Sequence, residues 1–322
     1  MLTLPLAGIL RKHLPNAKIY WLGQPYARPV VEACQYVDGF LERAVMLQKP
    51  EEWANLRIDT ILHVSPDHAV ATLADRLKIA NRIGTSHRSF HWLRCNHLVN
   101  LGRKGSNLHE AQLNAKLLGP MGLPDTFTLE ELSAYYGLVV PPYQGSVAVP
   151  ADKFKLVLHP KSSGSAREWP LANFLSLAQT LPQDRFEIYV SGLAGEGELV
   201  KAAIPALFEL PNVHDITGQM SLPEFISFVQ AADGLLAAST GPLHIAAALG
   251  KKALGLYPPI KPMHPGRWAP VGPEAGYLVR ELNCRACRYT PEQCACMAHI
   301  SVDSVSRTLL DWLQVPIEER RA

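Results

Sequence analysis

The sequence predicts an α/β protein made of two doubly wound parallel-sheet domains in tandem. Its 322 residues suffice for two domains. Short apolar runs alternate with segments whose apolar residues recur at the helical period, a pattern typical of βαβ units. A stretch with several prolines and little periodicity, residues 124–153, separates the two halves. We therefore expect an N-terminal domain at 1–150 and a C-terminal domain at 151–322.

The first half begins with an apolar helical pattern and then alternates strands and helices. A continuous apolar run predicts a strand at 59–66, and Asp67 followed by His68 is suited to begin the next helix. The expected elements are helix 2–14, strand 18–23, helix 29–36, strand 59–66, helix 67–80, strand 82–85 and helix 107–119.

The second half shows the same alternation more regularly. Pro170 is well placed in the first turn of one helix, and Ser221 with Glu224 has the spacing of a capping box at the start of another. The expected elements are strands 155–160, 186–192, 212–218, 234–239 and 252–257, and helices 169–181, 196–208, 222–233, 242–249 and 302–313, with an irregular stretch at 258–300. Five strands with intervening helices make a doubly wound parallel sheet.

The composition argues against several classes of protein. Lys plus Arg is 31 and Asp plus Glu is 29, for a formal charge of +2, whereas nucleic-acid-binding proteins usually carry a concentrated basic excess. No apolar stretch approaches the roughly 20 residues of a membrane span, and the apolar start lacks the basic region and cleavage site of a signal peptide. We expect a cytoplasmic protein whose six cysteines form no disulfide framework.

The loop STGPLH at 239–244 is suited to bind an anion, because it joins the fourth predicted strand to a short helix. Ser239 and Thr240 can cap that helix, and Gly241 permits close approach of a ligand. The free N–H groups and the positive helix end favour a phosphate, at which His244 would point. The alternative is an ordinary helix cap with a structural histidine.

The loop at 159–170 is rich in serine and follows the first strand of the same sheet. Ser162, Ser163 and Arg167 are suitable hydrogen-bond donors to a diphosphate. The loop lacks the GKS or GKT ending of a Walker loop, which argues against a P-loop NTPase. The alternative is a flexible surface loop with a solvated arginine.

The loop at 191–198 follows the second strand of this sheet. Glu196 and Glu198 are acids of the type that holds ribose hydroxyls in dinucleotide sites. Alternatively, both are first-turn acids that interact favourably with the dipole of the following helix. The loop has no G-x-G-x-x-G motif, so an NAD site is poorly supported.

Together and in this order, the three loops resemble the C-terminal domain of glycosyltransferase family nine, the heptosyltransferases of lipopolysaccharide core assembly. The matching stretches are LHPKSSGSAREWPLANF, ITGQMSLPEF, STGPLHIAAALGKKALGLYPP, HPGRWAPVGP and the cysteine-rich CRACRYTPEQCACMAHIS. The third stretch is the most specific. The first domain matches more weakly, in LTLPLAGILRKHLPNAKIYWLG and NLHEAQLNAKLLGPMGL.

The resemblance implies a GT-B fold, in which two Rossmann-like domains face a cleft and the second mainly holds the donor. It implies an inverting transfer, without metal or cofactor, of a heptose or related sugar from an ADP-sugar to a lipopolysaccharide core-type acceptor. The lipid-linked acceptor implies peripheral contact with the inner membrane. The implied donor residues are Ser162, Ser163 and Arg167 at the diphosphate, Glu196 at the ribose, Met220 at the adenine, and Thr240, Gly241 and His244 at the phosphate-binding helix start.

The sequence departs from the family pattern at two places. Ser239 stands where the family usually has an aspartate, a change that would bear on donor choice. Family members also carry a strand and Gly-Asp before the Thr-Leu-Pro found here at 3–5, and that aspartate is the expected general base. Residues 1–15 contain no carboxylate. We therefore expect the chain as given to bind the donor but to transfer little, and we assign no catalytic residue.

Two alternatives to a transferase stay open. One is a non-catalytic relative that binds a nucleotide-sugar, and the other is a sugar-nucleotide epimerase of the same shape. Cations available for a phosphorylated acceptor in the first domain are His87, Arg88, Arg103 and Lys104, each of which could equally belong to a solvated basic face.

The cysteines fall into two groups. Cys284, Cys287, Cys294 and Cys296 are close enough in sequence to hold a zinc ion tetrahedrally, with reduced thiols or a disulfide as alternatives. Cys34 and Cys95 are expected to be lone buried thiols.

Overall fold

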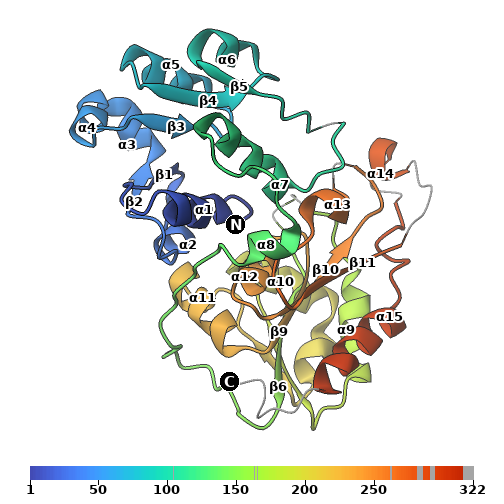
Figure 1. Cartoon of the computed structure of the whole chain (residues 1–322). Helices are drawn as coiled ribbons and strands as arrows, with labels where there is room; N and C mark the ends of the chain where they lie inside the picture. The colour runs from blue at the N-terminus through green and yellow to red at the C-terminus, as the bar shows by residue number, and fades with distance from the viewer. Residues whose placement is uncertain are drawn as a thin grey trace. The chain divides into compact units, whose positions relative to one another are not determined.

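The chain forms two compact units, one at residues 2–139 and one that begins at Val140 (Figure 1). The computed structural model describes residues 1–103, 105–162, 164, 166–261, 263–280, 286–290 and 294–314, without the side chains of residues 287 and 288. Each unit contains parallel sheets, which confirms the predicted α/β class.

The C-terminal unit is built on one sheet of six parallel strands in the order β11-β10-β9-β6-β7-β8. The strands are β6 (Phe154–His159), β7 (Phe186–Val190), β8 (Val213–Asp215), β9 (Gly234–Ala238), β10 (Lys252–Tyr257) and β11 (Ala275–Val279). The four central strands, β10, β9, β6 and β7, are almost wholly buried. Their sequences are mostly apolar because helices cover both faces of the sheet, with Lys155 in β6 and Glu187 in β7 as buried exceptions.

The sixth strand corrects the prediction of a five-stranded sheet. The stretch at 258–300 is not wholly irregular, since β11 and the short helices α13 (Pro265–Trp268) and α14 (Ala286–Tyr289) lie in it. Strand β11 pairs with β10 from Ala253 opposite Ala275 onward. Its residues are half-buried or exposed at the sheet edge, although AGYLV is an apolar run of strand length that the sequence prediction left in the irregular stretch.

Helices pack on both faces of this sheet. Phe186, Ile188 and Val190 of β7 share one core cluster with residues of α9, α10 and α15, whereas Tyr189 between them contacts Phe228 of α11 on the other face. The larger helices are α9 (Leu171–Thr180), α10 (Ala194–Ala203), α11 (Leu222–Ala231), α12 (Gly241–Ala248) and α15 (Val302–Asp311). All five begin within two residues of the predicted positions. Short 3-10 helices span Pro205–Glu209 and Trp312–Gln314.

The N-terminal unit contains two small parallel sheets, β1-β2 and β3-β4-β5. Their strands are β1 (Tyr20–Gly23), β2 (Gly39–Glu42), β3 (Thr60–Leu62), β4 (Asn81–Thr85) and β5 (His97–Val99). The helices are α1 (Pro5–His13), α2 (Arg28–Glu32), α3 (Arg43–Gln48), α4 (Pro50–Asn55), α5 (His68–Arg76), α6 (Ser89–Arg94), α7 (Glu110–Ala115) and α8 (Leu129–Ser133), with 3-10 helices at Pro25–Ala27 and Lys116–Met121.

Several of these elements are missing from the sequence prediction. Strands β2 and β5 are short and only partly buried, so neither produces an apolar run. Helix α8 lies in the proline-containing stretch, where Thr128 and Glu131 form a capping box. The long helix expected at 107–119 is instead α7 followed by a 3-10 helix that contains Pro120.

Two predictions about local structure in this unit are confirmed. The Asp67 side chain accepts hydrogen bonds from the N–H groups of Ala69 and Val70 and so caps α5. Cys34 and Cys95 are free, buried thiols, and burial raises the pKa of Cys95 to about 11.

Candidate functional site

The strand order of the C-terminal sheet has a topological switch point between the neighbouring strands β6 and β9. From β6 the chain continues to β7 and β8 on one side, whereas β9 leads to β10 and β11 on the other. The loops that follow β6 and β9 therefore leave the sheet in opposite directions. In open α/β sheets such a point creates a crevice at the carboxyl ends of the strands, where ligands bind.

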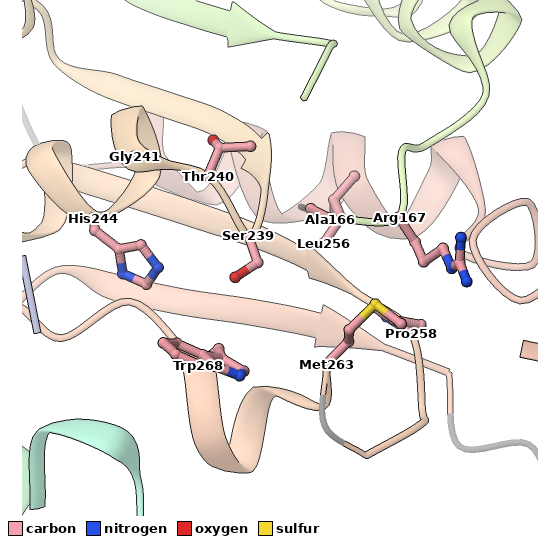
Figure 2. Close-up of a pocket in the computed structure, with 10 residues that line it drawn as sticks. All are labelled: Ala166, Arg167, Ser239, Thr240, Gly241, His244, Leu256, Pro258, Met263 and Trp268. Carbon is pink, nitrogen blue, oxygen red and sulfur yellow. The ribbon is translucent and has the colours of Figure 1, made fainter. Parts of the chain in front are cut away.

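A pocket of about 290 Å³ lies at these strand ends, lined by the loops after β6, β9 and β10. Figure 2 shows Ser239, His244 and Trp268 turned toward the same space, with the Arg167 guanidinium on the opposite side of the view from His244. The lining residues are Ala166, Arg167, Ser239, Thr240, Gly241, His244, Leu256, Pro258, Met263 and Trp268.

The start of α12 supplies the polar part of the pocket. Thr240 is the extended N-cap residue, and its buried Oγ1 has no hydrogen-bond partner among the described residues. A Cβ added at Gly241 would meet no atom within 4 Å. The first N–H groups of a helix have no partner inside it. This end of α12 can therefore receive an anion without displacing protein atoms.

His244 lies one turn into α12 and is 9% exposed. Its N–H donates to the Thr240 carbonyl at 3.4 Å, so the side chain of His244 lies above the helix start. Together, Thr240, Gly241 and His244 are brought to one pocket, as the sequence predicts.

Ser239 is held by a neighbouring strand. Its hydroxyl is hydrogen-bonded to Tyr257 at the end of β10, and the Tyr257 hydroxyl donates to the carbonyl of Trp268 at 2.5 Å. Burial raises the pKa of Tyr257 far above its usual value, so the phenol stays neutral at physiological pH. The Ser239 position therefore offers the pocket a neutral hydroxyl.

Arg167 reaches the pocket from the loop after β6. The loop is anchored two residues later by Trp169, which is 1% exposed and donates from its indole Nε1 to the Ile300 carbonyl at 2.9 Å. Trp169 also packs edge-on against Phe174 of α9, with ring centroids 5.0 Å apart. This anchor limits the positions that the Arg167 backbone can take.

Ser162 is not brought to the pocket. Its N–H donates to Glu168 Oε1 at 2.7 Å and its hydroxyl donates to the same oxygen at 3.2 Å, while Lys161 forms an ion pair with the other carboxylate oxygen. Of the described residues in this loop, Ala166 and Arg167 line the pocket. Ser163 lies outside the described residues.

The two other expected donor residues also lie outside the set of described residues that lines the pocket. Glu196 accepts a hydrogen bond from the Leu193 N–H at 2.8 Å, at the start of α10, so it caps that helix as the alternative interpretation states. Met220 is half-buried just before α11, where Glu224 accepts a hydrogen bond from the Ser221 N–H at 2.8 Å.

Sequence reasoning gave no role to the apolar side of the pocket. Leu256 and Pro258 follow from β10, and Met263 and Trp268 come from the segment after it. The stretches GLYPP and HPGRW were available as a signal, since both are among those that carry the family resemblance. Arg267 stacks on the Trp268 ring, 5.0 Å from its centroid.

The cysteine cluster can be followed only in part. The N–H of Cys296 donates to Cys294 Sγ at 3.4 Å, and Cys296 is buried. Cys284 and the side chain of Cys287 lie outside the described residues. Within the part of the chain that is described, no three His, Cys, Asp or Glu side chains are grouped to hold a metal ion.

The expected acceptor cations are in different environments. Arg103 is paired with Glu110 at 2.8 Å and is largely structural, and His87 is hydrogen-bonded to Asn100 at 2.6 Å. Arg88 is exposed, and Lys104 lies outside the described residues. None of the helices in the described residues is long and apolar enough to span a membrane.

An α/β N-terminal unit with parallel strands, and a Rossmann-like C-terminal unit with a pocket at its strand ends, are typical of the GT-B class. Comparison with known proteins places the chain in that class. Residues 55–298 match the profile of glycosyltransferase family 9 (heptosyltransferase). The chain belongs to this family. A candidate glycosyltransferase of Haemophilus influenzae is 24% identical over 296 residues, which cover 83% of this chain and 81% of that protein.

Solved structures agree on the GT-B fold. A family 9 glycosyltransferase of Veillonella parvula matches with a TM-score of 0.74 at 18% identity, covering 97% of this chain and 93% of that one. The ADP-heptose lipopolysaccharide heptosyltransferase II of Escherichia coli matches with a TM-score of 0.72 at 16% identity, covering 100% and 96%. The E. coli heptosyltransferase WaaC with ADP matches with a TM-score of 0.71 at 14% identity, covering 97% and 95%.

Proposed function

We propose that this glycosyltransferase transfers a heptose or a related sugar from an ADP-sugar to a lipopolysaccharide core-type acceptor in the cytoplasm. Family 9 membership supports a transferase. Structural relatives are described with ADP and with ADP-2-deoxy-2-fluoro heptose, which supports an ADP-sugar donor. In this proposal, residues 151–322 bind the donor and residues 1–150 face the acceptor.

The observation that carries the proposal is the pocket at the start of α12. The donor diphosphate would lie there, near the free end of the helix, the Thr240 hydroxyl and His244. Arg167 would bind the same diphosphate from the loop after β6. Ser239 would meet the donor with a hydroxyl in place of a carboxylate.

The other proposed donor contacts, from side chains outside the pocket lining, require those side chains to change position when the donor binds. Ser162 must exchange its bonds to Glu168 for a phosphate oxygen, and Ser163 would act beside it. Glu196 would bind the ribose with the carboxylate oxygen that does not cap α10, and Met220 would pack on the adenine.

The chemistry follows from where charge develops. In an inverting transfer, the acceptor hydroxyl attacks the anomeric carbon and loses its proton to water, because no side chain is assigned as the base. The bond from that carbon to the phosphate oxygen breaks, and ADP leaves with an added negative charge. Arg167 and the N-terminus of α12 stabilise this charge, so the reaction does not require a metal ion to neutralise the leaving group.

Binding of ADP tests the proposal. At 100 times the dissociation constant, ADP should add about 2.7 kcal/mol to the free energy of unfolding, measured as a rise in the thermal midpoint. A midpoint unchanged by millimolar ADP, ADP-heptose and other nucleotide-sugars contradicts it. Binding without any transfer to the acceptor would favour the non-catalytic alternative.

The Arg167→Ala substitution should weaken ADP binding by about 1.5–3 kcal/mol, because a guanidinium forms charge-assisted bonds to phosphate. The loss should exceed that of Glu196→Ala, whose ribose contact is largely uncharged on the ligand side. Arg185→Ala is the matched control, since it removes the same charge from an exposed loop before β7. Isothermal calorimetry with ADP measures all four proteins, and equal affinities of wild type and Arg167→Ala would place the diphosphate elsewhere.

Chelation should leave donor binding and any transfer intact, since Arg167 and α12 supply the positive charge. The measurement is ADP affinity before and after dialysis against EDTA. Loss of binding that magnesium restores would show that a metal ion bridges the diphosphate. Unfolding in a strong zinc chelator would instead indicate a structural zinc at the cysteine cluster.

A further inference from the structure

The charge distribution of the N-terminal unit is strongly uneven along the chain. Between Asp75 and Glu110, residues 76–109 contain seven Lys or Arg residues and no Asp or Glu. The whole chain carries a formal charge of only +2. This segment contains β4, α6 and β5 (Figure 1). Arg82, Arg88 and Arg94 lie in or next to these elements, and the other described cations lie at the end of α5 and in the loops on either side.

Few carboxylates compensate these cations in the fold. The Asp75 carboxylate forms ion pairs with three cations, Lys78, Arg82 and Arg94, at nitrogen–oxygen distances of 3.6, 3.7 and 3.0 Å. Arg88, at the N-cap of α6, is exposed and forms no ion pair with any described residue. The segment therefore keeps a net positive charge after its ion pairs are counted.

The same segment exposes large apolar side chains. Trp92 and Leu93 of α6 are 64% and 79% exposed, and Leu98 of the edge strand β5 is 45% exposed. Arg88 is the extended residue that precedes this helix, and its side chain is exposed like that of Trp92. We call His87, Arg88, Trp92, Leu93 and Leu98 the α6 surface.

Hydrogen bonds hold these residues around one turn. The Trp92 indole donates to the Ser86 carbonyl at 2.7 Å, and the Ser86 N–H donates to the Val99 carbonyl at 2.9 Å, next to Leu98. His87 is bonded to Asn100, directly after β5. The apolar side chains are thus presented from a structured turn, with cations at their border.

We propose that the α6 surface docks on a bilayer that contains anionic phospholipid. An exposed Trp and Leu bordered by cations suit the membrane interface, where the indole lies at the depth of the headgroups and cations meet phosphates. A second copy of the chain is a poorer occupant, because a symmetric contact would bring Arg88 and the net positive segment around it toward the same segment of the other copy. The role of this docking, access to a lipid-linked acceptor, rests on the proposed function, but the docking itself does not.

Co-sedimentation with vesicles tests the docking. The full chain, without donor, is mixed with vesicles of phosphatidylcholine alone or with added phosphatidylglycerol, at low and high salt. We expect binding to the anionic vesicles that falls with salt. The double variant Trp92→Ser/Leu93→Ser should bind them at least about tenfold less, and Arg88→Glu should lose about fivefold per unit of charge changed.

The control is Leu199→Ser, at an exposed leucine of α10 in the other unit, which should bind vesicles as the wild type does. Quenching by brominated lipids gives a second readout, since it should fall in Trp92→Phe although five tryptophans remain. Circular dichroism and the ADP-induced thermal shift, measured without vesicles, check that each variant is folded and test the proposed donor site separately.

Three results would overturn the docking. The first is wild-type protein that binds neutral and anionic vesicles equally, and the second is a double variant that binds anionic vesicles as well as the wild type does. The third is a wild-type dimer that the double substitution dissociates, which would assign the α6 surface to contact with a second copy.

Discussion

The Gly241→Glu variant is expected to lose at least about 100-fold in ADP affinity while its fold becomes no less stable. The new side chain has room, because a Cβ at this position meets no atom within 4 Å. A carboxylate in the first turn of α12 is favourable to the helix dipole by about 0.3–1 kcal/mol. The same carboxylate occupies the proposed diphosphate position and repels its charge. Binding and stability should therefore change in opposite directions.

The two measurements are calorimetric titration with ADP and the thermal midpoint of the unliganded protein. Gly276→Glu in β11 is the matched control, since it adds the same charge at a glycine that is also open and lies outside the pocket lining. Wild-type ADP affinity in Gly241→Glu would show that the start of α12 does not bind the diphosphate.

The Trp169→Ala variant should lower the free energy of unfolding by about 3–5 kcal/mol. Trp169 is fully buried, packs edge-on against Phe174 and donates to the Ile300 carbonyl, so its removal leaves both a cavity and an unpaired acceptor. Trp169→Phe keeps most of the ring and should lose only about 1–3 kcal/mol, from the missing hydrogen bond.

Urea-induced unfolding followed by circular dichroism measures these losses. Trp92→Ala is the control because Trp92 is mostly exposed, and its loss should stay below about 1 kcal/mol. If Trp169→Ala costs no more than Trp92→Ala, the loop after β6 is held by something other than this indole, and Arg167 is positioned differently from the account above.

The N-terminal unit was the harder half to predict. Strands β1 and β3 were found from KIYWLG and DTILHVSP, but β2 and β5 were not. A strand of three or four residues that is exposed on one side carries neither an apolar run nor enough length for a period. Such strands are stabilised by pairing with a neighbour, which depends on residues distant in the sequence.

Among the residues predicted to bind the donor, those at the start of α12 are the easiest to place from the sequence. Thr240, Gly241 and His244 belong to one continuous strand-to-helix turn, so their relative positions follow from local geometry. Ser162 and Glu196 were harder, because each has a competing partner a few residues away, Glu168 and the Leu193 N–H. A list of suitable side chains does not show which hydrogen bond is made.

The sequence by itself determined the α/β class, the central strands of the C-terminal sheet and the small, capped turn that begins α12. These features depend on local patterns, namely apolar runs of strand length and a small, capped turn before a helix. The tertiary structure alone decided that β11 extends the sheet and that Ser239 bonds Tyr257. It also decided that Met263 and Trp268 close the apolar side of the pocket. These features depend on contacts between segments that are separated along the chain, and such contacts form only when the packed sheet brings the segments together.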